Sequence, residues 1–374
     1  MPPQNTKMLS CNLMLRINQL KLTQYRNYIN QTFLFDTPLT GICGPNGTGK
    51  TNLLDAIYYG CFTKSYFTNQ DQSITQFEKD GFRIDLNFNL NDQTKEVSCI
   101  YRGASKKEII LNGIPYEKRS EHIGLLSAVM VAPDDIELIN GSGEIRRKWL
   151  DTLLCQTDKE YLLKLMDYNR ILQQRNSLLK QMATHPTASS DLLGIYDTQL
   201  VPLGSFIYEK RNSACKILLG WIQNEYQAIS NHRETIALDY ESSLSTLSFE
   251  DILNRQRKTD KALQRTSAGI HRDDLSLKME GRLFKQIGSQ GQKKTMLMAM
   301  KLAELEFIKQ QKSFYPILML DDVFEKLDAN RMNELLTLVC QKSGIQILIT
   351  DTHPQRLEEN FKRLPIQSNL LQIS

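Results

Sequence analysis

The chain has 374 residues, 41% of them hydrophobic and 24% charged, which is the composition of a globular protein of about two to three domains. Lys and Arg outnumber Asp and Glu by only 46 to 42, so the net charge alone does not indicate a nucleic-acid partner. The 7 cysteines are scattered without a C-x-x-C pair, and no apolar run approaches the roughly 20 residues of a membrane span. This argues against a disulfide framework, a zinc site and a membrane protein, and a cytoplasmic setting is expected.

Two strands are predicted at the start of the chain. Apolar and polar residues alternate over 13–22 and again over 31–35, the pattern of half-buried strands. A short apolar run at 39–43 predicts a third, buried strand that leads into a glycine-rich loop. We expect the first two strands to frame this loop from one side.

The glycine-rich loop is a complete G-x-x-x-x-G-K-[ST] motif, which consists of Gly44, Pro45, Asn46, Gly47, Thr48, Gly49, Lys50 and Thr51. Glycines let backbone N–H groups surround a phosphate, and a helix predicted from about 49 to 59 directs the positive end of its dipole there. Lys50 supplies a positive charge, and Thr51 offers a hydroxyl ligand to Mg²⁺. The loop therefore predicts a site for nucleotide phosphates and Mg²⁺.

An antiparallel lobe is predicted after this helix. Strands are expected over 83–90 and 96–102, and the pair Asn112-Gly113 indicates a tight hairpin turn. Another apolar strand is expected over 125–131, followed by a short helix that opens at Pro133 with acidic residues in its first turn. A helical region begins near 142.

From about 158 the apolar spacing changes to alternating steps of three and four, with Arg175 as the one polar residue in register, where it should weaken the seam. A second set repeats this spacing, so two antiparallel helices are expected to form an arm on the order of 40 Å long. Pro202 lies in the second helix and is expected to kink or interrupt it. The two stripes are Leu165, Tyr168, Leu172, Leu179 and Met182, then Leu193, Tyr196, Leu200, Leu203, Ile207, Ala214, Ile217 and Trp221. They fit either the core of a helical bundle or a partner-binding arm.

Ser248 has the position of a helix cap, and four basic residues follow it at helical spacing, with Arg257 off their line. The four are Arg255, Lys258, Lys261 and Arg265. Such a row is either a solvated face or a contact surface for DNA phosphates. His271 is interpreted as a polar turn residue.

The C-terminal third adds motifs that resemble those of ABC-type ATPases. The tetrapeptide at the start of a long predicted helix, Ser289, Gln290, Gly291 and Gln292, resembles their S-x-G-Q signature. An apolar strand then ends in Asp321 and Asp322, as a Walker B strand does. By this resemblance Asp321 binds Mg²⁺ and Asp322 orients the attacking water. Asp322 is one methylene shorter than the usual Glu, so slow hydrolysis is expected.

By the same resemblance, residues 325–328 form the D-loop, and a core strand follows over 345–350. His353 is either a switch histidine of the nucleotide site or an ordinary loop residue. The order of P-loop, signature and acidic strand indicates an ABC-type ATPase more specifically than any single motif does.

Taken together, these motifs resemble the RecF family of ABC/SMC-type ATPases from about residue 14 to the C-terminus. Besides the P-loop with 52–58 and the signature, the stretches that carry the resemblance are 321–324, Arg26-Asn27-Tyr28, Arg146-Arg147-Lys148-Trp149-Leu150-Asp151 and His271-Arg272-Asp273-Asp274. The resemblance implies an α/β fold: an ABC-type P-loop ATPase head, with a mixed sheet and an antiparallel lobe, plus a mostly helical lobe with a short antiparallel arm. We expect three segments, 1–145 and 265–374 forming the head and 146–264 the helical lobe.

The resemblance also implies a cytoplasmic ATPase of recombinational repair. ATP would close a head-to-tail homodimer on double-stranded or gapped DNA, with Ser289 reaching the nucleotide of the other copy, and Lys50 and Asp322 would be catalytic. A weak, DNA-stimulated ATPase would help RecO and RecR to load RecA at single-strand gaps. The alternatives are an SMC-type head, another ABC ATPase such as a transporter subunit, and a DNA clamp that binds ATP without hydrolysing it.

Overall fold

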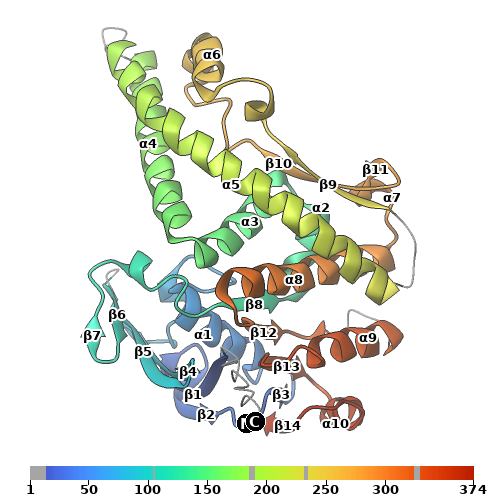
Figure 1. Cartoon of the computed structure of the whole chain (residues 1–374). Helices are drawn as coiled ribbons and strands as arrows, with labels where there is room; N and C mark the ends of the chain where they lie inside the picture. The colour runs from blue at the N-terminus through green and yellow to red at the C-terminus, as the bar shows by residue number, and fades with distance from the viewer. Residues whose placement is uncertain (1–13, 104–105, 185–189, 231–234, 324–328) are drawn as a thin grey trace, which may run out of the picture.

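The computed structural model describes residues 14–103, 106–184, 190–230, 235–323 and 329–374. Two sheets and their helices form a head in the lower half of Figure 1, and long helices form a lobe above it. The predicted α/β architecture, with an antiparallel lobe and a helical arm, is confirmed.

The antiparallel sheet has six strands in the order β2-β1-β4-β5-β6-β7. Alternating residues of β1, among them Leu20 and Leu22, are fully buried, as the sequence pattern predicts. Asn112 and Gly113 connect β6 to β7, which confirms the predicted hairpin. The strands are β1 (Leu15–Tyr25), β2 (Tyr28–Leu34), β4 (Phe82–Leu90), β5 (Gln93–Tyr101), β6 (Lys107–Leu111) and β7 (Ile114–Pro115).

The second sheet of the head has five parallel strands in the order β14-β3-β13-β12-β8. Every residue of β3, β8, β12 and β13 is buried, because helices or the other sheet cover both faces. Because β3, β13 and β12 are neighbouring parallel strands, their carboxyl ends lie side by side at one edge of the sheet. The strands are β3 (Leu39–Cys43), β8 (Ala128–Val131), β12 (Ile317–Leu320), β13 (Ile347–Asp351) and β14 (Ser368–Gln372).

Helix α1 (Lys50–Phe62) lies between the two sheets of the head. Its side chains Leu53 and Ile57 belong to one apolar core with residues of both sheets, such as Leu86 and Met130. Because the helix is buried almost all round, it joins the sheets into one body and fixes the loop at its N-terminus.

The helical lobe consists mainly of α3 (Gly143–Thr157), α4 (Lys159–Thr184), α5 (Ser190–Ser230) and α6 (Phe249–Leu263). Helices α4 and α5 form the predicted antiparallel pair (Figure 1), and Tyr168, Leu179, Leu200 and Ile207 of the predicted stripes are buried in it. The predicted interruption at Pro202 is wrong, because α5 runs through this residue as one helix of 41 residues.

The prediction that Arg175 weakens the arm is revised by its surroundings. Arg175 is fully buried and pairs with Asp197 on α5 and with Asp260 on α6, each at 2.7 Å, so its charge is compensated. It also donates a hydrogen bond of 2.8 Å to Thr266. The residue therefore ties three helices together in the middle of the arm.

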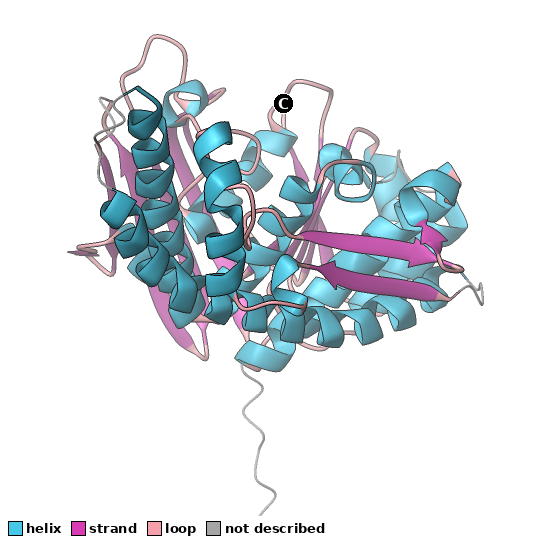
Figure 2. Cartoon of the chain, turned by 90° about the horizontal axis from the view of Figure 1, so that it is seen from above, coloured by secondary structure: helices cyan, strands magenta, loops and turns pink. Residues whose placement is uncertain are grey.

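The remaining elements are a small antiparallel ribbon and further helices. The ribbon of β9 (Ile236–Glu241), β10 (Asp274–Met279) and β11 (Arg282–Leu283), with β9 and β10 at the right of Figure 2, joins residues on both sides of the boundary expected at 264/265. The three-segment division stays a prediction. The other helices are α2 (Glu137–Asn140), α7 (Phe284–Ile287), α8 (Gln290–Lys312), α9 (Ala329–Cys340) and α10 (Pro354–Phe361).

We predict that Arg175→Met destabilises the protein by about 3–5 kcal/mol, because it leaves the fully buried carboxylate of Asp260 without its cation, while Asp197 keeps its pair with Arg257. The matched control is Arg170→Met on the same helix, where an exposed ion pair with Asp167 is lost. The control should change the free energy of unfolding by less than about 0.5 kcal/mol. Urea unfolding of both variants measures the difference, and equal effects would contradict the structural role of Arg175.

Candidate nucleotide-binding site

The P-loop lies between β3 and α1, as the sequence predicts, and its glycines have the backbone freedom that a phosphate cradle needs. Gly47 and Gly49 have φ angles of 84° and 108°, which side-chain-bearing residues rarely adopt. A Cβ atom on Gly49 would lie 2.6 Å from the Asn27 amide nitrogen. The loop therefore requires glycine at both positions, and its backbone leads directly into the N-terminus of α1, the helix end that attracts phosphate.

Lys50 is buried and curls back over the P-loop. Its Nζ atom donates hydrogen bonds to the carbonyl oxygens of Gly44, at 2.8 Å, and Pro45, at 3.0 Å. The ammonium group is thus held at the loop, where phosphate oxygens could replace the two carbonyls as acceptors.

The turn between β1 and β2 clamps the P-loop from outside. The Asn27 amide donates to the Thr48 carbonyl at 2.8 Å, and the Tyr28 hydroxyl donates to the Gly49 carbonyl at 2.9 Å. The two strands thus flank the loop as expected, but sequence reasoning assigned no role to these side chains. The available signal was the stretch Arg26-Asn27-Tyr28, which carries part of the family resemblance but does not reveal what its side chains touch.

The side chain of Asp55 holds the P-loop helix to its surroundings. It is fully buried and pairs with Arg26 at 3.1 Å, and it accepts a hydrogen bond from the Tyr25 hydroxyl at 2.9 Å. On its other side it accepts hydrogen bonds from Ser65 and from the Tyr66 backbone N–H. Sequence reasoning did not single out this carboxylate.

Thr51 and Asp321 meet at the edge of the parallel sheet, although 270 positions separate them. The Thr51 hydroxyl lies 3.0 Å from both oxygens of the Asp321 carboxylate, and the Thr350 hydroxyl donates to the same carboxylate at 2.8 Å. Burial raises the pKa of Asp321 to about 6, against the lowering effect of these hydrogen bonds. The hydroxyl and the carboxylate suit Mg²⁺, which prefers oxygen ligands.

Asp322 adopts a left-handed backbone conformation, with a φ of 48°, directly after β12. Its backbone N–H donates to the Thr350 hydroxyl at 2.9 Å. Thr350 therefore binds both consecutive aspartates. Its own strand, β13, lies between β3 and β12, but the sequence by itself does not reveal that order.

Ser289 caps α8 and has the exposed position that a contact with a second copy would need. Its hydroxyl accepts the Gln292 N–H at 3.2 Å, and the Gln292 side chain accepts the Ser289 N–H at 2.8 Å, which makes a capping box. Helix α8 has 23 residues, so its N-terminus carries a full dipole end. The roles of Ser289, Gln290, Gly291 and Gln292 in binding a nucleotide stay predictions.

Two further predicted features are less defined. His353 is exposed at the N-cap of α10, and its backbone N–H donates to Asp351 at 2.9 Å. Its role as a switch stays a prediction. The expected D-loop, residues 325–328, lies outside the described residues.

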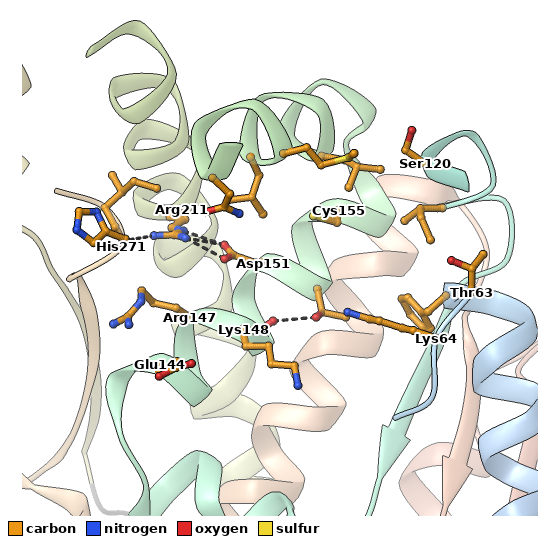
Figure 3. A pocket seen from close by; sticks show the side chains of 18 of the residues that line it. Thr63, Lys64, Ser120, Glu144, Arg147, Lys148, Asp151, Cys155, Arg211 and His271 are labelled. Carbon is orange, nitrogen blue, oxygen red and sulfur yellow. Dashed lines mark hydrogen bonds and ion pairs between the residues drawn. The ribbon is translucent and has the colours of Figure 1, made fainter. Parts of the chain in front are cut away.

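A basic groove runs between the head and the helical lobe, with a volume of about 760 Å³. Lys64, Arg119, Lys148 and Arg272 line it from four different segments and are all exposed. Within the residues that the structure describes, none of these four forms an ion pair. Figure 3 shows Lys64 and Lys148 reaching into the same space.

The charge of the groove is not balanced by its own carboxylates. The carboxylates in the lining are Asp151 and Glu144. Asp151 pairs with the buried Arg211 at 2.9 Å, so Glu144 is left to balance the exposed cations. Burial, and then the neighbouring charge of Lys148, lowers the pKa of Lys64. Clustered cations that repel one another favour an anionic ligand. Sequence analysis missed this groove because its cations are far apart in the chain.

Comparisons with known proteins agree with the motifs. Residues 16–369 match the family described as RecF/RecN/SMC N terminal domain. The DNA replication and repair protein RecF of Flavobacterium johnsoniae is 39% identical over 93% of this chain and 97% of its own length. The RecF of Parabacteroides distasonis is 38% identical over 92% of this chain and 93% of its own. The chain belongs to the RecF family. The predicted resemblance is thereby confirmed.

Solved structures also match this RecF-family chain. The recombination mediator protein RecF of the RecFOR pathway, solved with ATP, superposes with a TM-score of 0.85 and 29% identity, covering 91% of this chain and 92% of the other. An Smc head domain of Pyrococcus furiosus has a TM-score of 0.55 at 16% identity over 93% of this chain and 92% of its own, which shows a shared fold. The predicted ABC-type head is confirmed. No helix in the described parts of the chain is long and apolar enough to cross a membrane.

We predict that Lys50→Ala lowers ATP affinity by about 10- to 100-fold or more, because charge-assisted hydrogen bonds to the phosphates are lost. Lys50→Arg should retain more binding, since it keeps the charge. Lys64→Ala, which removes a lysine from the groove instead, is the control and should leave ATP affinity within about twofold. Titration with a fluorescent ATP analogue measures all three, and wild-type affinity in Lys50→Ala would exclude the P-loop as the phosphate site.

Proposed function

We propose that this RecF-family chain is an ATP-hydrolysing, DNA-binding protein of recombinational repair that closes into a head-to-tail homodimer on DNA. The observation that carries the proposal is the meeting of the P-loop residue Thr51 with Asp321 and Thr350 at the edge of the parallel sheet. Ligands of open parallel sheets bind at the carboxyl ends of the strands, where this cluster lies.

In this proposal the P-loop residues 44–51 bind the phosphates of ATP, and Lys50 neutralises their charge. Thr51 and Asp321 would hold Mg²⁺, which when bound supplies positive charge to the phosphate oxygens. Asp322 orients the attacking water. Because its carboxylate has a shorter reach than that of Glu, turnover is slow.

The proposed dimer is supported by the exposed cap at Ser289. The N-terminus of a long helix attracts a phosphate through its dipole, and an exposed capping hydroxyl adds a polar contact. In a head-to-tail dimer this end of α8 would meet the nucleotide held by the other copy's P-loop. ATP would then be the bridge between the two copies.

The basic groove is the surface that we assign to DNA. Its exposed cations, Lys64, Arg119, Lys148 and Arg272, come from both the head and the lobe. Phosphate contacts need only Lys and Arg on one surface and no fixed spacing. The groove therefore supports binding of double-stranded and gapped DNA, with DNA-stimulated hydrolysis. The exposed basic residues Arg255, Lys258 and Lys261 of α6, with Arg265 just after it, could extend this surface.

The biological setting that we propose follows from the relatives. Proteins of 35–39% identity are named DNA replication and repair protein RecF, and the structure solved with ATP is assigned to the RecFOR pathway. We infer a cytoplasmic role at single-strand gaps, in which this chain acts with RecO and RecR to load RecA.

The second candidate function is a clamp that binds ATP without hydrolysing it. A variant of Asp322 distinguishes this clamp from the proposed ATPase. We predict that Asp322→Asn binds ATP normally but hydrolyses it at least about tenfold more slowly, because the water loses its orienting carboxylate. The variant should accumulate as ATP-bound dimer. Phosphate release and sedimentation test this, with Asp134→Asn, an acidic residue outside the site, as the control. A wild-type protein that releases no phosphate would favour the non-hydrolysing clamp.

The dimer is tested by Ser289→Arg. A bulky cation at the proposed contact should block ATP-dependent dimerisation while ATP affinity of the monomer stays within about twofold. In the wild type, dimerisation adds phosphate contacts, so log affinity for duplex DNA should fall more steeply with log salt, by roughly 0.9 per added contact. The variant should keep the shallow slope of the monomer. A variant that dimerises with ATP and shows the wild-type slope would refute closure through the signature.

A further inference from the structure

Residues 63–66 connect the basic groove to both halves of the nucleotide site. We propose that Ser65 and Tyr66 are positioning residues that transmit occupancy of the groove by a nucleic-acid phosphate backbone to ATP hydrolysis. The inference rests on the proposed function, because it concerns how DNA would stimulate the ATPase. It assigns a task to side chains that touch neither the nucleotide nor the groove.

The first connection runs from this segment to the P-loop. The Ser65 hydroxyl donates to both oxygens of Asp55, at 2.9 and 2.8 Å, and the Tyr66 backbone N–H donates to the same carboxylate at 2.8 Å. Asp55 in turn pairs with Arg26, the neighbour of the residue that clamps the P-loop. A shift of the segment therefore acts on α1 and on the clamp through one fully buried carboxylate.

The second connection runs to the helix that carries the signature. The Tyr66 hydroxyl donates a short hydrogen bond to Asp135, which pairs with Lys301 of α8 at 3.1 Å. Lys301 is buried and also donates to the Met130 carbonyl at 2.7 Å. Burial by itself lowers the pKa of Lys301, but the carboxylates of Asp135 and Glu304 outweigh this effect, so that the pKa is raised above its usual value. Lys301 therefore stays charged and holds α8 to the head.

The third connection is to the groove itself, and it occurs twice. Lys64 lines the groove, and the next two residues enter the network. In the same way, Lys148 of α3 lines the groove, while its neighbour Trp149 donates to Glu304 of α8 at 3.0 Å. Of the cations that an anionic ligand would draw together, Lys148 is thus one residue and Lys64 two residues away from a side chain that contacts α8.

The physical state of this network suits transmission of a small movement. Its charges are buried and paired, so a partly broken arrangement would leave buried ions without partners, which favours discrete arrangements over gradual deformation. A cavity of about 200 Å³, lined by Tyr58, Tyr66, Trp149, Lys301 and Glu304, gives the side chains room to change. An anion between Lys64 and Lys148 would remove their repulsion and bring α3 and residues 63–66 closer.

The test removes one hydroxyl. Tyr66→Phe keeps the ring but loses the bond to Asp135, so the stimulation of ATPase activity by DNA should fall by at least about fivefold. Basal ATPase activity and DNA affinity should each stay within about twofold of wild type, since neither site is touched. Ser65→Ala, which loses the bonds to Asp55, should also reduce the stimulation. ATPase assays with and without duplex DNA, together with DNA titrations, give the three readouts.

Two control variants separate transmission from packing and from binding. Tyr58→Phe also removes a tyrosine hydroxyl from the lining of the same cavity, but this hydroxyl makes no hydrogen bond within the described residues, so stimulation should be unchanged. Lys148→Glu places a negative charge in the groove and should lose DNA affinity and stimulation together.

Each outcome decides something. Three results would overturn the transmission role alone. The first is normal stimulation in Tyr66→Phe, and the second is an equal loss of stimulation in Tyr66→Phe and Tyr58→Phe. The third is a loss of basal activity or of DNA affinity in Tyr66→Phe. If DNA does not stimulate the wild-type ATPase, the proposed DNA-stimulated function fails, and the transmission role fails with it. If Lys148→Glu binds DNA normally, the groove assignment is wrong, and so is transmission from it.

Discussion

The contact between Thr51 and Asp321 is the interaction on which the site depends. It forms because β3 and β12 flank β13 in the parallel sheet, so that residues from the P-loop, the acidic strand and Thr350 reach the same edge. A strand order that placed more than one strand between β3 and β12 would leave the P-loop without its partner carboxylate. The buried helix α1 then fixes the loop against both sheets, and this makes the geometry rigid.

Buried charges recur at the joints between parts of the molecule. Asp55 joins the P-loop helix to the turn before β2, Lys301 joins the signature helix to residues 130–135, and Arg175 joins the helices of the arm. Each is paired, and breaking one partner away would leave an uncompensated charge. Apolar packing alone would allow small sliding at these joints, whereas paired charges define a register between elements.

The basic groove and the nucleotide site are separate, yet both contact the same few segments. The groove takes its cations from residues 63–66 after α1, from residues 119–121, from α3 and from the turn before β10. Of these segments, residues 63–66 bond to Asp55 of α1, and α3 contacts α8. A ligand that pulls on the groove therefore acts on the elements that carry the P-loop and the signature. In the proposed function, this arrangement would couple DNA in the groove to the nucleotide without a long chain of contacts.

The sequence by itself determined what depends on neighbouring residues. The P-loop with its glycines, the capping serines Ser248 and Ser289, and the alternating strands follow from local backbone preferences and short periods. Tertiary structure alone decided which distant groups meet: Asn27 with Thr48, Thr350 with both aspartates, and Arg175 with Asp260. Arg175 looked like a defect in an apolar stripe, because a stripe does not show its carboxylate partners on other helices. Strand order and helix packing bring such groups together, and no local pattern encodes either.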